Sequence, residues 1–405
     1  MAAAFLLFAA CLLALAAPFA RVVELPHLPV LQALIYGLAI VGAAAVLAWA
    51  TEVAQLEIPR ALAYSVLALI AVLPEYAVDM YFAWAAGTRP EYTAYAAANM
   101  TGANRLLIGI GWPLVVLLAW LTVRQRRAAS NPIAPLPVRL PSDARLDIAV
   151  LALATLYAFL LPFKASISLL DGAILIGFFA FYAWRVAQAH RAEPELLGPA
   201  ALIARLPDGL RRAATVLLFV LAGVSIFSAA EPFAEALIET GTVLGIDRFL
   251  LVQWLAPFAS EAPELVVVSL LALRRQAGLG LAALLSSKVN QWTLLVGMLP
   301  LAYSLGASEL RALPLDPHQA EEVLLTAAQS LLAVAVLLDL RLSGRDAWML
   351  FLLFSVQFVV PAVRLPVTVV YLVLAGLLLV VQRDRFRDYL PSRRAAEPVG
   401  PEPKP

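Results

Sequence analysis

The sequence predicts an all-α polytopic membrane protein with two inverted-topology repeats of about five helices each, one extra helix at each end, and about 12 transmembrane helices in total. Composition is the first observation, because 62% of the 405 residues are hydrophobic and only 14% are charged. A soluble core of this length could not bury so much apolar surface, so lipid must surround the protein. The other two observations are a series of membrane-length apolar stretches and a polar motif that occurs once in each half.

Twelve apolar stretches approach or exceed the roughly 20 helical residues needed to cross a hydrocarbon core. They run over 3–20, 29–51, 61–86, 93–122, 146–163, 167–188, 211–234, 247–273, 277–305, 320–340, 346–362 and 366–382. If the N-terminus is cytoplasmic and every stretch crosses, most arginines between the spans lie on the cytoplasmic side, as the positive-inside rule requires. We therefore expect an integral membrane protein with both termini cytoplasmic. The arginine-rich and alanine-rich composition, without organelle-targeting features, favours a bacterial inner (cytoplasmic) membrane.

The same pattern divides the chain into segments. The first twenty residues lack the positively charged start of a signal peptide, so we interpret them as a retained helix. In chain order we expect an extra N-terminal transmembrane helix at 1–28, a first repeat at 29–188, a cytoplasmic linker at 189–210, a second repeat at 211–362, an extra C-terminal transmembrane helix at 363–390 and a disordered tail at 391–405.

A Pro-Glu motif lies within one predicted span of each half. Residues 73–78 read LPEYAV and residues 262–267 read APELVV, and in each half the next span carries an asparagine followed by an apolar run with a glycine. By the span count the two copies cross the membrane in opposite directions, which makes them an inverted repeat. Secondary transporters are typically built this way, with their substrate sites near the midplane where helices are interrupted.

Glu75 and Glu264, the acids of this motif, are placed near the bilayer midplane by their distance from the helix ends. An ionised residue there costs at least roughly 2.5 to 3.5 kcal/mol on the insertion scale, so its presence indicates a function. The proline before each glutamate frees a backbone carbonyl one turn earlier. Carboxylate and carbonyl oxygens together suit Na⁺ or Ca²⁺. A structural polar contact between helices is the alternative reading of these acids.

These motifs resemble the two repeats of the cation/calcium exchanger superfamily, the sodium/calcium exchanger membrane region. Its members carry a Pro-Glu motif in one helix and a Gly-Asn-x-x-Gly-Ser-Asn motif in the next. Here residues 98–104 read ANMTGAN and keep both asparagines and the glycine, whereas residues 284–290 read LLSSKVN and keep only the final asparagine.

The resemblance implies a set of ion-binding residues. Glu75 and Glu264 correspond to the glutamates that coordinate Ca²⁺ in the family, and these two are the expected metal ligands. The polar accessories implied by the same alignment are Asn99, Asn104, Asn290 and Ser260. Hydroxyls that help to bind Na⁺ in the family are missing, because Ala71 and Val72 precede Leu-Pro-Glu in the first copy.

Two further charged residues depart from the family pattern. Lys288 stands where the first copy has Gly102, and Arg105 follows Asn104. A fixed ammonium at Lys288 could replace a bound Na⁺, which would mean fewer coupled Na⁺ ions or proton coupling. We expect Glu261 to be its partner.

Asp79 lies one turn after Glu75 and on the same helix face. It is equally well explained as a second ligand, a proton carrier or the partner of Arg105. The acids Asp171, Glu231, Glu321 and Glu322 lie near predicted helix ends and are expected to be solvated.

The function predicted from these observations is secondary active antiport of Ca²⁺ or another cation against Na⁺ or H⁺, by alternating access. One alternative is a transport-inactive or structural relative whose site Lys288 and Arg105 neutralise. The other is a membrane-embedded enzyme acting on a lipid-linked substrate, which the midplane depth of the acids disfavours. We expect no enzymatic activity and no cofactor; the partners would be the bilayer and the transported cations, with no nucleic acid. The sequence leaves the oligomeric state open.

Overall fold

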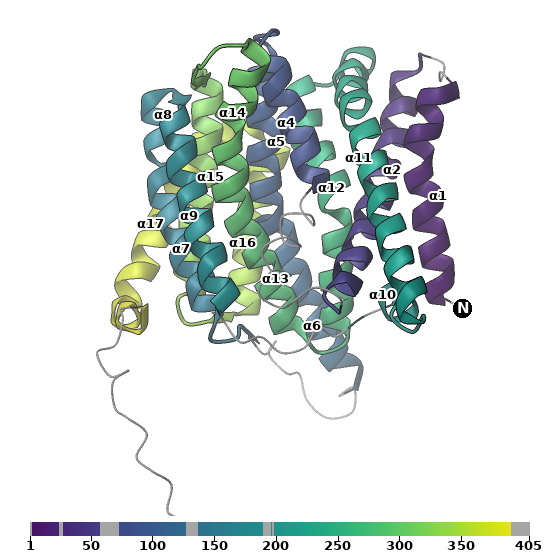
Figure 1. Cartoon of the computed structure of the whole chain (residues 1–405). Coiled ribbons are helices and arrows are strands. Elements are labelled where there is room, and N and C mark those ends of the chain that lie inside the picture. Colours follow the sequence, from purple (N-terminus) through teal and green to yellow (C-terminus); the bar gives the residue numbers. More distant parts are fainter. Residues whose placement is uncertain are drawn as a thin grey trace, which may run out of the picture.

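The computed structural model describes residues 2–23, 27–56, 73–126, 137–188, 196 and 198–389, most of them helical (Figure 1). The elements of the first half are α1 (Ala2–Val23), α2 (Pro29–Ala54), α4 (Leu73–Ala86), α5 (Tyr92–Leu106), the π-helical turn η1 (Leu107–Gly111), α6 (Trp112–Arg126), β1 (Val138–Arg139), α7 (Ala144–Ala158), α8 (Leu160–Lys164), β2 (Ser166–Ile167) and α9 (Leu169–Gln188).

The elements of the second half repeat part of this order. They are α10 (Pro199–Ile203), α11 (Asp208–Leu244), α12 (Arg248–Leu273), α13 (Ala277–Asn290), the π-helical turn η2 (Gln291–Leu295), α14 (Val296–Ala307), β3 (Leu313–Pro314), α15 (Pro317–Leu337), β4 (Arg341–Leu342), α16 (Gly344–Val359), the 3₁₀ turn η3 (Pro361–Val363), α17 (Arg364–Val381) and the 3₁₀ turn η4 (Arg383–Tyr389).

Eight single helices of the described residues are long and apolar enough to cross a membrane, and the two parts of the bent helix α12 add a ninth span if counted as one. The three remaining predicted spans contain α4, the α13–α14 run and the 16-residue helix α16. A helix therefore lies in each of the twelve predicted stretches. Many outward side chains of these helices are large and apolar, such as Val373 and Leu377 of α17, as a lipid-facing surface requires.

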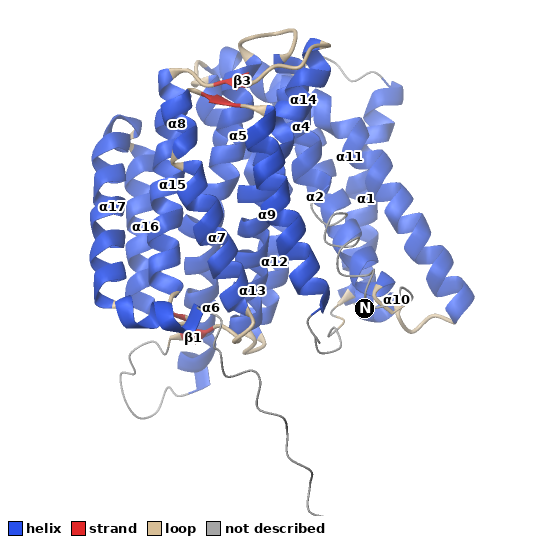
Figure 2. Ribbon diagram, turned by 60° about the vertical axis from the view of Figure 1, so that its left-hand side comes forward, coloured by secondary structure: helices blue, strands red, loops and turns tan. Residues whose placement is uncertain are grey.

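Two short antiparallel strand pairs join the halves at opposite ends of the bundle. β1 pairs with β4, and β2 pairs with β3. β1 and β3 each follow the helix after a π-helical turn, yet Figure 2 shows them at opposite ends of the molecule. Corresponding elements thus point in opposite directions, and the inverted repeat predicted from the motifs is confirmed.

Helices α1, α2 and α11 lie together at one edge of the bundle (Figures 1 and 2). Over part of their length they enclose a hydrophobic core of their own, which includes Ala14, Val46 and Ala222. Near the β2–β3 end, Glu235 of α11 accepts hydrogen bonds from Arg89 in the α4–α5 turn at 2.7 Å and from two tyrosine hydroxyls of α4 and α5 at 2.5 Å each. This partly buried carboxylate therefore ties α11 to the α4–α5 region of the bundle.

Two glycines allow the central helices to approach closely. A Cβ added to Gly102 of α5 would lie 1.8 Å from the backbone oxygen of Gln253 in α12, and one added to Gly306 of α14 would lie 1.8 Å from the backbone oxygen of Trp84 in α4. Backbones in such contact leave no room for a side chain, so these crossings of the two halves need glycine.

Candidate ion-binding site

The carboxylates of the two Pro-Glu motifs meet in the middle of the bundle. Glu75 lies in the first described turn of α4, and Glu261 and Glu264 lie on either side of the position at which α12 bends by 56°. The bend falls on the proline of the second motif, whose missing amide hydrogen breaks the helical ladder there. The corresponding residues before Leu73 lie outside the described residues, so the prediction of a break in the first copy is not tested.

Glu261 links the two motif glutamates. Its side chain lies close to both Glu75 and Glu264. Glu75 and Glu261 are buried, while Glu264 is partly exposed. The sequence-predicted pair Glu75 and Glu264 thus belongs to a cluster of three acids, which we call the carboxylate cluster.

Neutral side chains of the α13–η2 region donate to this cluster. The amide of Gln291 donates to Glu261 Oε1 at 2.6 Å and also contacts Glu75. The hydroxyl of Ser287 donates to Glu264 Oε2 at 3.0 Å. Gln291 is the first residue of the π-helical turn η2, a type of turn that is frequent at functional sites. Neither Gln291 nor Ser287 is among the residues predicted from the sequence, although an amide and a hydroxyl within an apolar span are a usable signal.

The four predicted polar accessories take different positions. Asn290 Oδ1 accepts from the Tyr76 hydroxyl at 2.9 Å, and Asn104 donates to the carbonyl of its own helix and accepts from Lys288. Ser260 donates to carbonyl oxygens of α12. Asn99 is buried, and among the described residues its side-chain atoms have no hydrogen-bond partner.

Lys288 does not pair with Glu261, so that prediction is wrong. Its Nζ donates to Asn104 Oδ1 at 2.6 Å and to Asn104 O at 3.2 Å, and it lies 4.5 Å from the centre of the Trp292 ring. Glu261 accepts from Gln291 instead. The ammonium is therefore held by neutral oxygens rather than by an acid.

Arg105 is directed away from the carboxylate cluster. It forms an ion pair with Glu322 of α15 and donates to Gln357 Oε1 of α16 at 2.8 Å. Of the three readings of Asp79, the ion pair with Arg105 is thereby excluded. Asp79 is fully buried, lies near Asn99, and neither of its oxygens has a hydrogen-bond partner in the described structure.

Glu322 is the centre of a second buried charged group, which we call the Glu322 network. Besides Arg105, it binds Arg364 of α17, with Nε 2.5 Å from Glu322 Oε1, and accepts from Gln253 of α12 at 2.9 Å. The expectation that Glu322 is solvated is wrong, because α17 and α12 cover it completely. The same holds for Asp171, which is buried and paired with Lys164.

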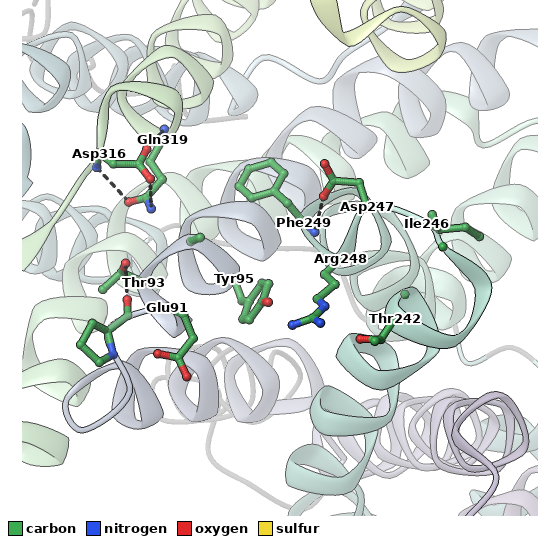
Figure 3. Close-up of a pocket in the computed structure, with 14 residues that line it drawn as sticks. Glu91, Thr93, Tyr95, Thr242, Ile246, Asp247, Arg248, Phe249, Asp316 and Gln319 are labelled. Carbon is green, nitrogen blue, oxygen red and sulfur yellow. Dashed lines mark hydrogen bonds between the residues drawn. The ribbon is translucent and has the colours of Figure 1, made fainter.

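An open hollow of about 730 Å³ lies at the β2–β3 end, between the α4–α5 turn, the α11–α12 turn and the start of α15. Figure 3 shows Glu91, Arg248 and Tyr95 among the side chains around it. None of the predicted ion-binding residues lines it. Of the acids that line it, Asp247 and Asp316 cap the N-termini of α12 and α15.

In chemical terms the site offers hard oxygen ligands from both repeats. Carboxylate, amide and hydroxyl oxygens are the groups that bind Ca²⁺, Na⁺ and protons. In the described part of the chain, no three His, Cys, Asp or Glu side chains are arranged so that they could hold one metal ion. The acids of the cluster contact one another instead of surrounding a common point.

An inverted repeat that brings acids from both halves together inside a helical bundle is typical of secondary transporters for small cations. The family model of the sodium/calcium exchanger protein matches residues 27–187 and 214–363. The chain therefore belongs to the sodium/calcium exchanger family, whose members are cation antiporters.

Solved structures agree with this assignment. The crystal structure of an H⁺/Ca²⁺ exchanger, CAX, is 45% identical, with 96% of each chain covered and a TM-score of 0.89. The sodium-calcium exchanger NCX_Mj is 17% identical over 82% of this chain and 99% of its own, with a TM-score of 0.52. The Ca²⁺/H⁺ antiporter protein YfkE is 11% identical over 87% and 98%, with a TM-score of 0.62. The last two share the fold. No curated protein sequence gave a match.

Proposed function

We propose that this protein exchanges Ca²⁺ for H⁺ at the carboxylate cluster. The observation that carries the proposal is the contact of Glu261 with both Glu75 and Glu264. Two carboxylates that lie close together in a buried site repel each other unless one of them holds a proton. The arrangement is thus suited to carrying protons, whereas separation of the same acids would offer oxygens to a divalent cation.

Calcium is the proposed partner ion because the cluster consists of carboxylates supported by neutral amides and hydroxyls. Such ligands suit Ca²⁺, which accepts many oxygen ligands in flexible geometry. The 45% identical relative is described as an H⁺/Ca²⁺ exchanger, which supports the same pair of ions. The absence of the family hydroxyls at Ala71 and Val72 favours H⁺ over Na⁺ as the counter-ion.

Access to the cluster would alternate between the two ends of the bundle. We place the cytoplasm at the β1–β4 end, because most arginines of the connections fall on that side. Both termini would then be cytoplasmic, and a bacterial inner membrane is the proposed location. Residues 29–188 and 211–362 are the proposed exchanger repeats, joined by the linker at 189–210.

The test is Ca²⁺ uptake into proteoliposomes that contain the purified protein. An imposed pH gradient should drive uptake without Na⁺, and a proton uncoupler should abolish it. Glu75→Gln and Glu264→Gln should each reduce uptake to the level of empty liposomes. Glu309→Gln is the matched control, because Glu309 pairs with Arg311 on the surface, and it should leave uptake unchanged. Uptake that requires a Na⁺ gradient would refute the choice of proton, and unchanged uptake by both site variants would refute the carboxylate assignment.

A further inference from the structure

The side chain of Lys288 crosses from one repeat to the other. Lys288 belongs to α13, and its ammonium is bound by the backbone and side-chain oxygens of Asn104 in α5. It is completely buried, and the Trp292 ring covers it at a distance of 4.5 Å. The Lys288 ammonium therefore has the surroundings of a bound monovalent cation, namely neutral oxygens. Unlike a free ion, it is attached to the chain.

The repeat explains why this position differs between the halves. Lys288 precedes Asn290 by the same interval as Gly102 precedes Asn104. Gly102 cannot carry a side chain, because its Cβ would lie 1.8 Å from a backbone oxygen of α12. The second copy has space at the corresponding point, and the lysine uses this space to reach the first copy.

The ammonium is not an ion-pair partner of any described acid. Two acids of the carboxylate cluster have other donors, since Gln291 donates to Glu261 and Ser287 donates to Glu264. The neighbouring cation, Arg105, is bound by Glu322. Lys288 is thus close enough to act on Glu75 through its charge while its own donors are directed to neutral oxygens.

We propose that Lys288 is a tethered monovalent cation whose ammonium permanently fills an oxygen site at Asn104, so that the exchange needs no free Na⁺ there. A covalently attached cation cannot be released to either side, so it contributes charge to the site without contributing to transport. This inference rests on the proposed function and adds the residue that determines selectivity between Na⁺ and H⁺.

The test uses Lys288→Ala and Lys288→Met in the proteoliposome assay, with a bulky organic cation as the inert salt. The alanine variant leaves a space for the lost atoms, which correspond to propylammonium. Its uptake should fall about tenfold in the inert salt and recover when Na⁺ or propylammonium is added. The methionine variant fills the same space without charge, so its uptake should fall and should not recover with either cation.

Uptake by the wild-type protein distinguishes a failure of the proposed function from a failure of the tethered-cation proposal. If the wild type shows no uptake driven by a pH gradient, the proposed function fails, whatever the variants do. If the wild type does take up Ca²⁺, two results would refute the tethered-cation proposal. One is uptake by Lys288→Met equal to that of the wild type, and the other is uptake by folded Lys288→Ala that neither Na⁺ nor propylammonium changes. Folding is established by a single symmetric gel-filtration peak and an unfolding midpoint near that of wild type.

Discussion

Glu322→Gln should destabilise the protein strongly, because it leaves two arginines without their acid. Arg105 is 1% exposed and Glu322 is 0% exposed, so water cannot replace the lost partner. Removing one member of a buried ion pair typically costs about 3 to 5 kcal/mol. Arg364 bonds the other oxygen of Glu322 and is 13% exposed, so it adds to the loss. We therefore expect the free energy of unfolding to fall by an amount near the upper end of that range.

The measurement is thermal unfolding in detergent, followed by intrinsic tryptophan fluorescence and compared with two controls. Glu309→Gln breaks an ion pair whose members are 57% and 61% exposed, and it should lower the midpoint little, since such pairs contribute about 0 to 1 kcal/mol. The double variant Glu322→Gln with Arg105→Gln should regain part of the loss, because the uncompensated buried charge is gone. A midpoint for Glu322→Gln equal to that of Glu309→Gln would refute the reasoning.

Three further predictions concern other parts of the bundle. Gly102→Ala should lower the unfolding midpoint or prevent expression, because the added methyl group would collide with a backbone oxygen of α12. Gly376→Ala is the control and should leave the midpoint unchanged, because a Cβ added there meets no atom within 4 Å. Equal midpoints for the two variants would contradict this. Glu235→Gln should lower the unfolding midpoint more than Glu231→Gln does. Glu235 accepts hydrogen bonds from three side chains of the α4–α5 region, whereas Glu231 pairs with one exposed arginine. The reverse order of the two midpoints would refute the stabilising role of Glu235. Asp79→Asn should not lower the unfolding midpoint, because neither oxygen of this buried carboxyl has a hydrogen-bond partner among the described residues. A clear fall in the midpoint would contradict this.

Much of the fold was predictable because the bilayer imposes strong constraints on the chain. Each span must be long, apolar and internally hydrogen-bonded, and these requirements are visible as stretches in the sequence. A charged residue in such a stretch is conspicuous, so Glu75 and Glu264 could be recognised without coordinates. Their occurrence in two motifs of the same order also indicated the inverted repeat.

Partner choice among the buried charges was not predictable. Lys288 is three residues from Gln291 and close in sequence to no acid, and only the crossing of α13 with α5 directs it to Asn104. Arg105 finds Glu322 more than two hundred residues away, on a helix whose acids lie near its start. The position of Glu322 near a predicted helix end did not indicate that α12 and α17 would cover its carboxylate.

The sequence by itself determined the membrane class, the spans, the inverted repeat and the two central glutamates, because lipid solvation acts on each segment separately and leaves a local record. The tertiary structure decided which acid joins those glutamates, which oxygens hold Lys288 and where Arg105 is neutralised. These contacts depend on the angles and depths at which helices from the two halves cross, and helix-spacing patterns along one segment do not contain that information.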